Sequence, residues 1–211
     1  MLRFPVRTVA ACALATSFLA GCASGPYTGP VEVTRFIGDA PMRLGEGTIT
    51  IVFPEEMEND LARNAFASAV ADELGGLGYR LVMDEAGATQ IASVRTSRNP
   101  LAVPQQEGGP VSVGVGGGTG GFGSGVGVGV GINLGGGGDD EPRVVTELSV
   151  RISGLDGATL WEGRAQQPVS ISSPYSDVEA SARTLAAALF AGFPGGNGET
   201  VIVEIDELQE R

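Results

Sequence analysis

The sequence contains no histidine and no lysine, and its only two cysteines are Cys12 and Cys22. These absences exclude Ser-His-Asp and Cys-His nucleophile systems, Schiff-base lysines and the lysine of a Walker motif. They also remove the usual ligands of a zinc site, so we expect no metal and no cofactor. Acid–base chemistry would depend on carboxylates, tyrosines, arginines and hydroxyl groups. A carboxylate-dependent hydrolase stays a minor alternative, because glycosidases need only two carboxylates facing one cleft.

Positive charge is also scarce. Thirteen arginines stand against twenty-five aspartates and glutamates, which gives a formal net charge of −12. A strongly acidic protein repels nucleic acid and anionic lipid headgroups, so general electrostatics excludes both as binding surfaces. We therefore expect no nucleic-acid partner.

The start of the chain has the pattern of a lipoprotein signal. Arg3 and Arg7 form a positive n-region, and residues 8–19 are an apolar run of about a dozen residues, which suits a signal-peptide h-region but is too short to span a bilayer. A sequence that looks like a bacterial lipobox follows, made of Leu19, Ala20, Gly21 and Cys22. We predict that residues 1–21 are a lipoprotein signal peptide.

Cys22 would then carry the lipid, and its acyl chains at about 0.8 kcal/mol per buried CH₂ would anchor the protein. In lipoproteins of this kind, an aspartate after the cysteine tends to mean retention in the inner membrane. Ala23 stands there instead, so the resemblance implies the periplasmic face of the outer membrane. Residues 22–30 are expected to be a lipidated Gly/Pro tether, and the expected partners are this membrane and another envelope protein.

Residues 31–205 have the pattern of a single α+β domain. Apolar residues spaced as in strands occur at 31–36, 47–53, 79–83, 88–96, 144–152, 158–165 and 200–205. One amphipathic helix is expected to start at Pro54, with an inward face of Met57, Leu61, Phe66, Val70, Leu74 and Leu77. A capping box from Ser176 to Glu179 predicts the start of the second amphipathic helix. We predict a two-layer fold, in which two helices pack on one face of a mostly antiparallel sheet, and an acidic tail at 206–211.

Several stretches of this domain resemble a known family. They are VEVTRF, ELGGLGYRLV, LDGATLWEGRA and LAAALFAGFPGGNGETVIV. Together they are similar to the proteobacterial lipoprotein family that is catalogued as domain of unknown function 4136. The resemblance covers most of residues 31–205 and implies a fold and a compartment, but no activity, cofactor or catalytic residue. Trp161, within the third stretch, is expected to pack in the core or at an edge rather than to bind a sugar.

A glycine-rich insert at 108–142 interrupts the domain, with seventeen glycines in residues 108–138. Valine alternates with glycine at 111–116 and 125–132, which predicts a hairpin with valines on the core side and glycines outward. A glycine face lets another surface approach closely, so this face could be a contact surface. The simpler interpretation is that it lies under solvent or a loop. The candidate interaction surface comprises Gly114, Gly116, Phe122, Gly125, Gly127, Gly129 and Gly131.

The insert has three other possible interpretations. A phosphate-binding loop would have to open a helix, and no helical pattern follows before Asp177. A single match to a calcium-binding repeat at 135–140 lacks the stacked array that such repeats require. The uncharged segment 111–134 also fits a membrane-crossing hairpin of an oligomeric barrel. The sequence thus predicts a non-enzymatic envelope module, with an oligomeric export or pore subunit as the alternative.

Overall fold

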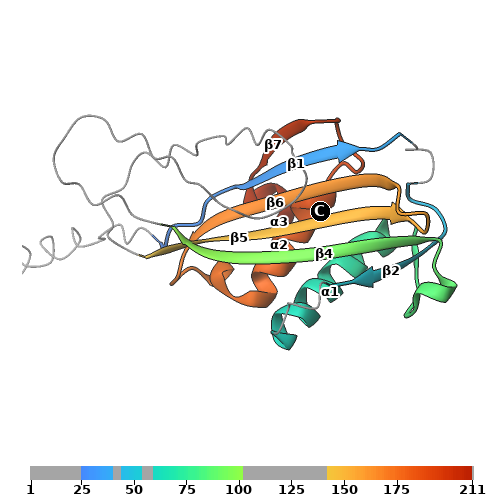
Figure 1. The fold of residues 1–211 in the computed structure, drawn as a ribbon. Helices are drawn as coiled ribbons and strands as arrows, with labels where there is room; N and C mark the ends of the chain where they lie inside the picture. The colour runs from blue at the N-terminus through green and yellow to red at the C-terminus, as the bar shows by residue number, and fades with distance from the viewer. Residues whose placement is uncertain (1–24, 40–43, 54–58, 102–141, 211) are drawn as a thin grey trace, which may run out of the picture.

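The computed structural model describes residues 25–39, 44–53, 59–101 and 142–210. These residues form one seven-stranded sheet, with the helices packed on one of its faces (Figure 1). The strands are β1 (Val31–Ile37), β2 (Thr48–Val52), β3 (Arg80–Leu81), β4 (Gln90–Leu101), β5 (Arg143–Gly154), β6 (Thr159–Ser170) and β7 (Glu199–Val203). The helices are α1 (Asp60–Gly76), α2 (Val178–Phe190) and the short α3 (Ile205–Gln209), with 3₁₀ turns at Glu85–Gly87 and Pro174–Ser176.

The strand order across the sheet is β3-β2-β4-β5-β6-β1-β7. Strand β2 runs parallel to both of its neighbours, and every other pair is antiparallel. The predicted two-layer α+β fold is therefore confirmed. The β5–β6 hairpin closes at the predicted turn, where Gly157 has a φ of +81° and the Gly154 N–H donates to the Ala158 carbonyl at 2.9 Å. A positive φ suits glycine because glycine has no Cβ.

Helix α1 begins at Asp60, and the Asn59 side chain caps it by accepting a hydrogen bond from the Ala62 N–H. The predicted start at Pro54 and the inward Met57 fall within 54–58, outside the described residues. The predicted inward face is confirmed at Phe66, Val70 and Leu74, which are buried.

The prediction was wrong for Leu61, which is 64% exposed because the first turn of α1 extends past the sheet-facing part of the helix. At the other end of α1, Gly78 takes a φ of +106° just after the C-cap residue Leu77. Glycine suits this helix end because it adopts a positive φ without the steric cost of a Cβ.

Helix α2 begins one residue later than the capping box predicted. The cap is Asp177, whose carboxylate accepts hydrogen bonds from the Glu179 and Ala180 N–H groups at 2.9 and 3.2 Å. Ser176 instead closes the preceding 3₁₀ turn. The two candidate caps are adjacent in sequence, and the aspartate also adds negative charge at the positive end of the helix dipole.

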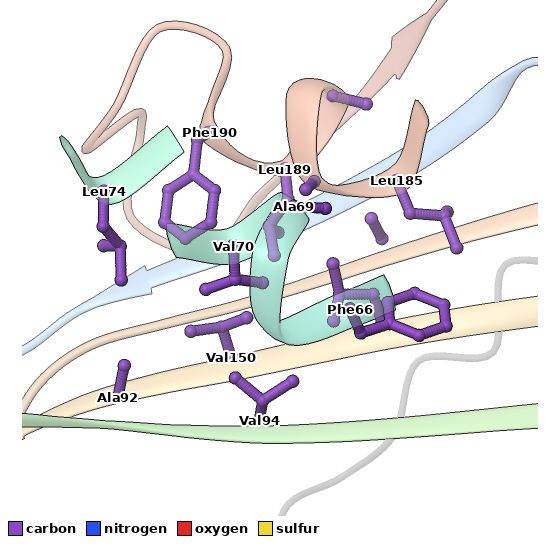
Figure 2. Packing of buried hydrophobic residues seen from close by; sticks show 14 of the residues in the cluster. Phe66, Ala69, Val70, Leu74, Ala92, Val94, Val150, Leu185, Leu189 and Phe190 are labelled. Carbon is purple, nitrogen blue, oxygen red and sulfur yellow. The ribbon is translucent and has the colours of Figure 1, made fainter. Parts of the chain in front are cut away.

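The core lies between the sheet and the two long helices. Figure 2 shows side chains of α1 pointing toward Ala92, Val94 and Val150 on the sheet, with side chains of α2 beside them. On β5, the residues with even numbers from Thr146 to Ile152 are buried, as the period-two pattern predicted. Helix α3 begins at Ile205 and continues into the expected acidic tail, and Ile205 and Leu208 pack partly buried against the core.

Candidate functional site at the insert end of the sheet

The predicted functional residues lie outside the described part of the chain. This applies to Cys22 with Leu19, Ala20 and Gly21, and to Gly114, Gly116, Phe122, Gly125, Gly127, Gly129 and Gly131. The lipid anchor, the hairpin within the insert and its glycine face therefore stay predictions. The structure does show where both segments join the fold.

The insert joins two neighbouring strands at one end of the sheet. The last residue of β4, Leu101, pairs with the first residue of β5, Arg143, and Arg143 pairs in turn with Ser170 at the end of β6. Strand β1 also starts at this end, so four strand ends lie together (Figure 1). We call this region the insert end; its described residues are Tyr27, Arg98–Leu101, Arg143–Val145 and Pro168–Ile171.

The residues before β1 are attached to the same end. The Gly29 N–H donates to the Pro168 carbonyl at 2.9 Å, and the Ser170 N–H donates to the Tyr27 carbonyl at 2.8 Å. A Cβ on Gly29 would lie 2.8 Å from the Pro168 ring, so glycine allows this close approach. The expected tether of residues 22–30 was thus predicted too long, because its last residues already pair with β6.

Side chains fasten this attachment further. The Arg143 guanidinium lies over the Tyr27 ring, 4.3 Å from its centroid, which is a cation–π distance. The Thr28 and Ser173 hydroxyls hydrogen-bond at 2.7 Å, and the Gln167 amide donates to the Gly29 carbonyl at 3.0 Å. The start of the fold is therefore held by four kinds of contact at the insert end.

A second arginine of the insert end reaches the helix layer. Arg98 donates to the Ser176 carbonyl at 2.7 Å and to the Ser176 hydroxyl at 2.6 Å. No described acidic residue forms a salt bridge with Arg98 or Arg143. Within the described ranges, this end of the sheet therefore presents arginines whose charge no carboxylate neutralises directly.

The face of the sheet opposite the helices carries polar and charged side chains. Arg151 pairs with Glu162 at 3.0 Å, and Arg164 pairs with Glu147 at 3.5 Å, each across β5 and β6. These acids serve as partners for arginines on an open sheet surface. Within the described segments, no group of three or more acidic side chains could hold a metal ion.

Sequence reasoning missed one buried charge. Arg35 of β1 is 6% exposed and points toward the C-terminus of α2. Its guanidinium donates to the carbonyls of Leu189 and Ala188, both at 3.0 Å, and of Ala191 at 2.8 Å. Burial lowers the pKa of Arg35, and the nearby Glu199 carboxylate opposes that change. Because the pKa of arginine starts so high, the side chain stays charged and caps the helix.

Trp161 lies in the core, which confirms the packing interpretation and rules out a sugar platform at this residue. It is fully buried, its ring stacks on Phe190 with centroids 5.4 Å apart, and it contacts Phe193 at 5.2 Å. Its indole N–H donates to the Pro194 carbonyl at 2.9 Å. Across the described helices, none is both long and apolar enough to cross a membrane.

Comparisons with known proteins add little on function. No protein-family model and no curated protein matches the sequence. The resemblance to the lipoprotein family of domain of unknown function 4136 therefore stays a prediction.

Several solved structures are similar in fold. One is a PelC dodecamer from Paraburkholderia phytofirmans, with a TM-score of 0.41 and 16% identity over 76% of this chain and 96% of that chain. Another is a PDZ domain protein from Parabacteroides distasonis, with a TM-score of 0.45 and 13% identity over 83% of this chain and 39% of that chain.

A third is a minor lipoprotein from Acinetobacter baumannii, with a TM-score of 0.30 and 10% identity over 69% of this chain and 91% of that chain. At TM-scores below 0.5 and identities this low, these likenesses carry no conclusion about what this protein binds or does.

Proposed function

We propose that the protein is a lipoprotein anchored to the periplasmic face of the outer membrane, where it acts as a non-enzymatic binding or accessory module of the envelope. The observation that carries this proposal is the lipobox ending at Cys22, followed five residues later by the start of the fold at Tyr27. A signal peptide, a lipid-accepting cysteine and a folded domain thus follow one another in the order that a lipoprotein requires.

A non-enzymatic role is supported by the chemistry that the chain offers. It has no histidine or lysine to serve as a general base or a nucleophile. The acids on the open sheet face, Glu147 and Glu162, each pair with an arginine of the neighbouring strand. Both carboxylates are thus engaged by guanidinium groups on this face, which supports a binding role over hydrolysis.

Replacing Cys22 with serine tests the anchor. The hydroxyl of serine cannot take the diacylglyceryl group, so Cys22→Ser should move the protein from the membrane pellet to the soluble periplasmic fraction. Cell fractionation, together with the intact mass of the purified protein, checks this. Cys12→Ser is the matched control, because Cys12 would leave with the signal peptide and its replacement should change neither result. Membrane retention of the Cys22→Ser protein would contradict the lipid anchor.

A second function, a subunit of an oligomeric export or pore assembly, is supported by one observation. The insert connects the paired residues Leu101 and Arg143, so a hairpin within it could continue β4 and β5 directly. Several copies of such a hairpin could form a barrel. The insert also leaves the fold at the same end as the predicted anchor.

The mass of the lipidated protein in mild detergent separates the two functions. Light scattering after gel filtration should give a monomer or a dimer if the protein is an accessory module. A closed ring of many copies would instead favour the pore subunit. The matched control is a variant that lacks residues 114–138. The number of copies per particle should stay the same if the protein is an accessory module, whereas the ring should be lost if it is a pore subunit.

A further inference from the structure

We propose that the insert end of the sheet faces the membrane and contacts the phospholipid headgroups, with the strands directed away from the bilayer. This inference rests on the proposed lipid anchor at Cys22. It assigns a binding surface and its partner: the phospholipid surface itself.

The length of free chain is the first argument. Tyr27, whose carbonyl accepts a hydrogen bond from the Ser170 N–H, stands five residues after Cys22. An extended chain spans at most about 3.6 Å per residue, so these five residues reach about 18 Å. Tyr27, Thr28 and Gly29 cannot lengthen the tether without breaking their contacts to Pro168, Val169 and Ser170. The insert end therefore stays within a short distance of the lipid.

The shape of the domain turns this short distance into an orientation. Strands β5 and β6 contain twelve residues each, which at about 3.3 Å per residue makes the sheet about 40 Å long. The opposite end of the hairpin, at Leu155, is thus separated from the insert end by more than twice the reach of the tether. The anchor holds one end of the sheet near the bilayer and leaves the other end free.

The side chains of the insert end suit headgroups. Arg98 is exposed and Arg143 is half-buried over Tyr27, so both guanidinium groups can reach phosphate oxygens. Ile171, just after β6, is 53% exposed and can pack at the acyl boundary. Tyr27 combines an apolar ring with a polar hydroxyl, a pairing that favours the interface.

Charge agrees with this orientation. At the opposite end of the sheet the strand ends and turns carry acids, namely Asp39, Glu46, Asp84, Glu85 and Asp156. The net charge of −12 excludes general electrostatic attraction to an anionic surface, so the proposed covalent lipid, and not charge, holds the protein at the bilayer. The described residues of the insert end include Arg98 and Arg143 and no acid, so this part of the sheet can accept phosphate oxygens. Asp177, which follows the Arg98 partner Ser176, is engaged as the cap of α2.

The test uses probes at the two ends of one hairpin. Ile171 and Leu155 are both exposed apolar residues, at 53% and 61%. The lipidated protein has no free thiol, because Cys22 is alkylated and Cys12 is removed, so Ile171→Cys and Leu155→Cys each accept one fluorophore. Each labelled protein is placed in phosphatidylethanolamine–phosphatidylglycerol vesicles that contain a nitroxide-headgroup lipid. We expect quenching several-fold stronger at position 171 than at position 155.

Two further measurements make the outcome decisive. Insertion of ten Gly/Ser residues between Ser24 and Gly25 should remove most of the difference, because the longer tether no longer fixes the orientation. Equal or reversed quenching with the native tether would overturn the proposal, and so would a difference that the longer tether leaves intact. Vesicle flotation and the intact mass are measured on the same samples. Protein that fails to float and lacks the lipid mass contradicts the anchor itself, whereas floating protein with equal quenching contradicts only the orientation.

Discussion

Replacing Arg35 with leucine should lower the free energy of unfolding by about 2–4 kcal/mol, because three buried carbonyls at the end of α2 lose their charged donor. Leucine fills part of the space but offers no hydrogen bond. The helix end also loses a positive charge near the negative end of its dipole. For a domain of this size the melting temperature should fall by about 5–15 °C, measured by circular dichroism.

Two variants make this result specific to the cap. Arg35→Lys keeps the charge but has one ammonium group in place of the guanidinium fork, so it should recover only part of the loss. Phe36→Ala changes the neighbouring residue, which is 53% exposed on the opposite face of β1, and should cost less than Arg35→Leu. If Arg35→Leu melts with the wild type while Phe36→Ala does not, the guanidinium does not hold the end of α2.

The example of Arg35 shows what the sequence could not predict. In β1 the alternation of Val31 and Val33 identifies the buried face, and Arg35 belongs to that face by period. The burial of Arg35 could not be predicted, because its partners are backbone carbonyls 153–156 residues away. Because every residue has a backbone carbonyl, the residue types do not reveal which carbonyls accept these hydrogen bonds. In contrast, β5 and the inward face of α2 were predictable, since their apolar periodicity comes directly from burial on one side.

The candidate site also has one part that the sequence could predict and one part that it could not. The insert, its composition and its predicted hairpin could be read from glycine and valine spacing alone. Its position beside the start of the fold could not, because that depends on the strand order β4-β5-β6-β1. The pairing of Leu101 with Arg143 and of Thr28 with Val169 brings together segments that are far apart in the chain. The strand order thus brings residues 27–29 and the described residues on either side of the insert to one end of the sheet.

The pairing at the insert end also explains why Gly29 stands before β1. The short tether is useful for orientation only if the fold holds its first residues firmly, and the close approach of Gly29 to Pro168 leaves no room for a side chain there. In the proposed anchored state, a longer loose segment would let the domain rotate freely about the lipid on Cys22. The local packing at residue 29 is therefore connected to the orientation of the whole sheet.

The core beneath α2 depends on a single aromatic cluster, of Trp161, Phe190 and Phe193. Gly163, two residues along β6 on the same face, provides the space for the indole: a Cβ there would lie 2.3 Å from the Trp161 ring and 2.8 Å from Leu189. The indole N–H is bonded to the Pro194 carbonyl, so the ring is held by its stacking on Phe190 and at its polar edge. Such a fully buried ring contributes through packing rather than through binding.

Replacing Trp161 with alanine should therefore cost about 3–5 kcal/mol, the range found when a large buried aromatic is removed and a cavity remains. The melting temperature should fall by about 10 °C or more, followed by circular dichroism because the only tryptophan is lost. Trp161→Phe is the matched control: it keeps a ring against Phe190 and loses the bond to Pro194, so a smaller loss of about 1–2 kcal/mol is expected. Equal stability of the alanine and phenylalanine variants would show that the stacked ring does not hold α2 to the sheet.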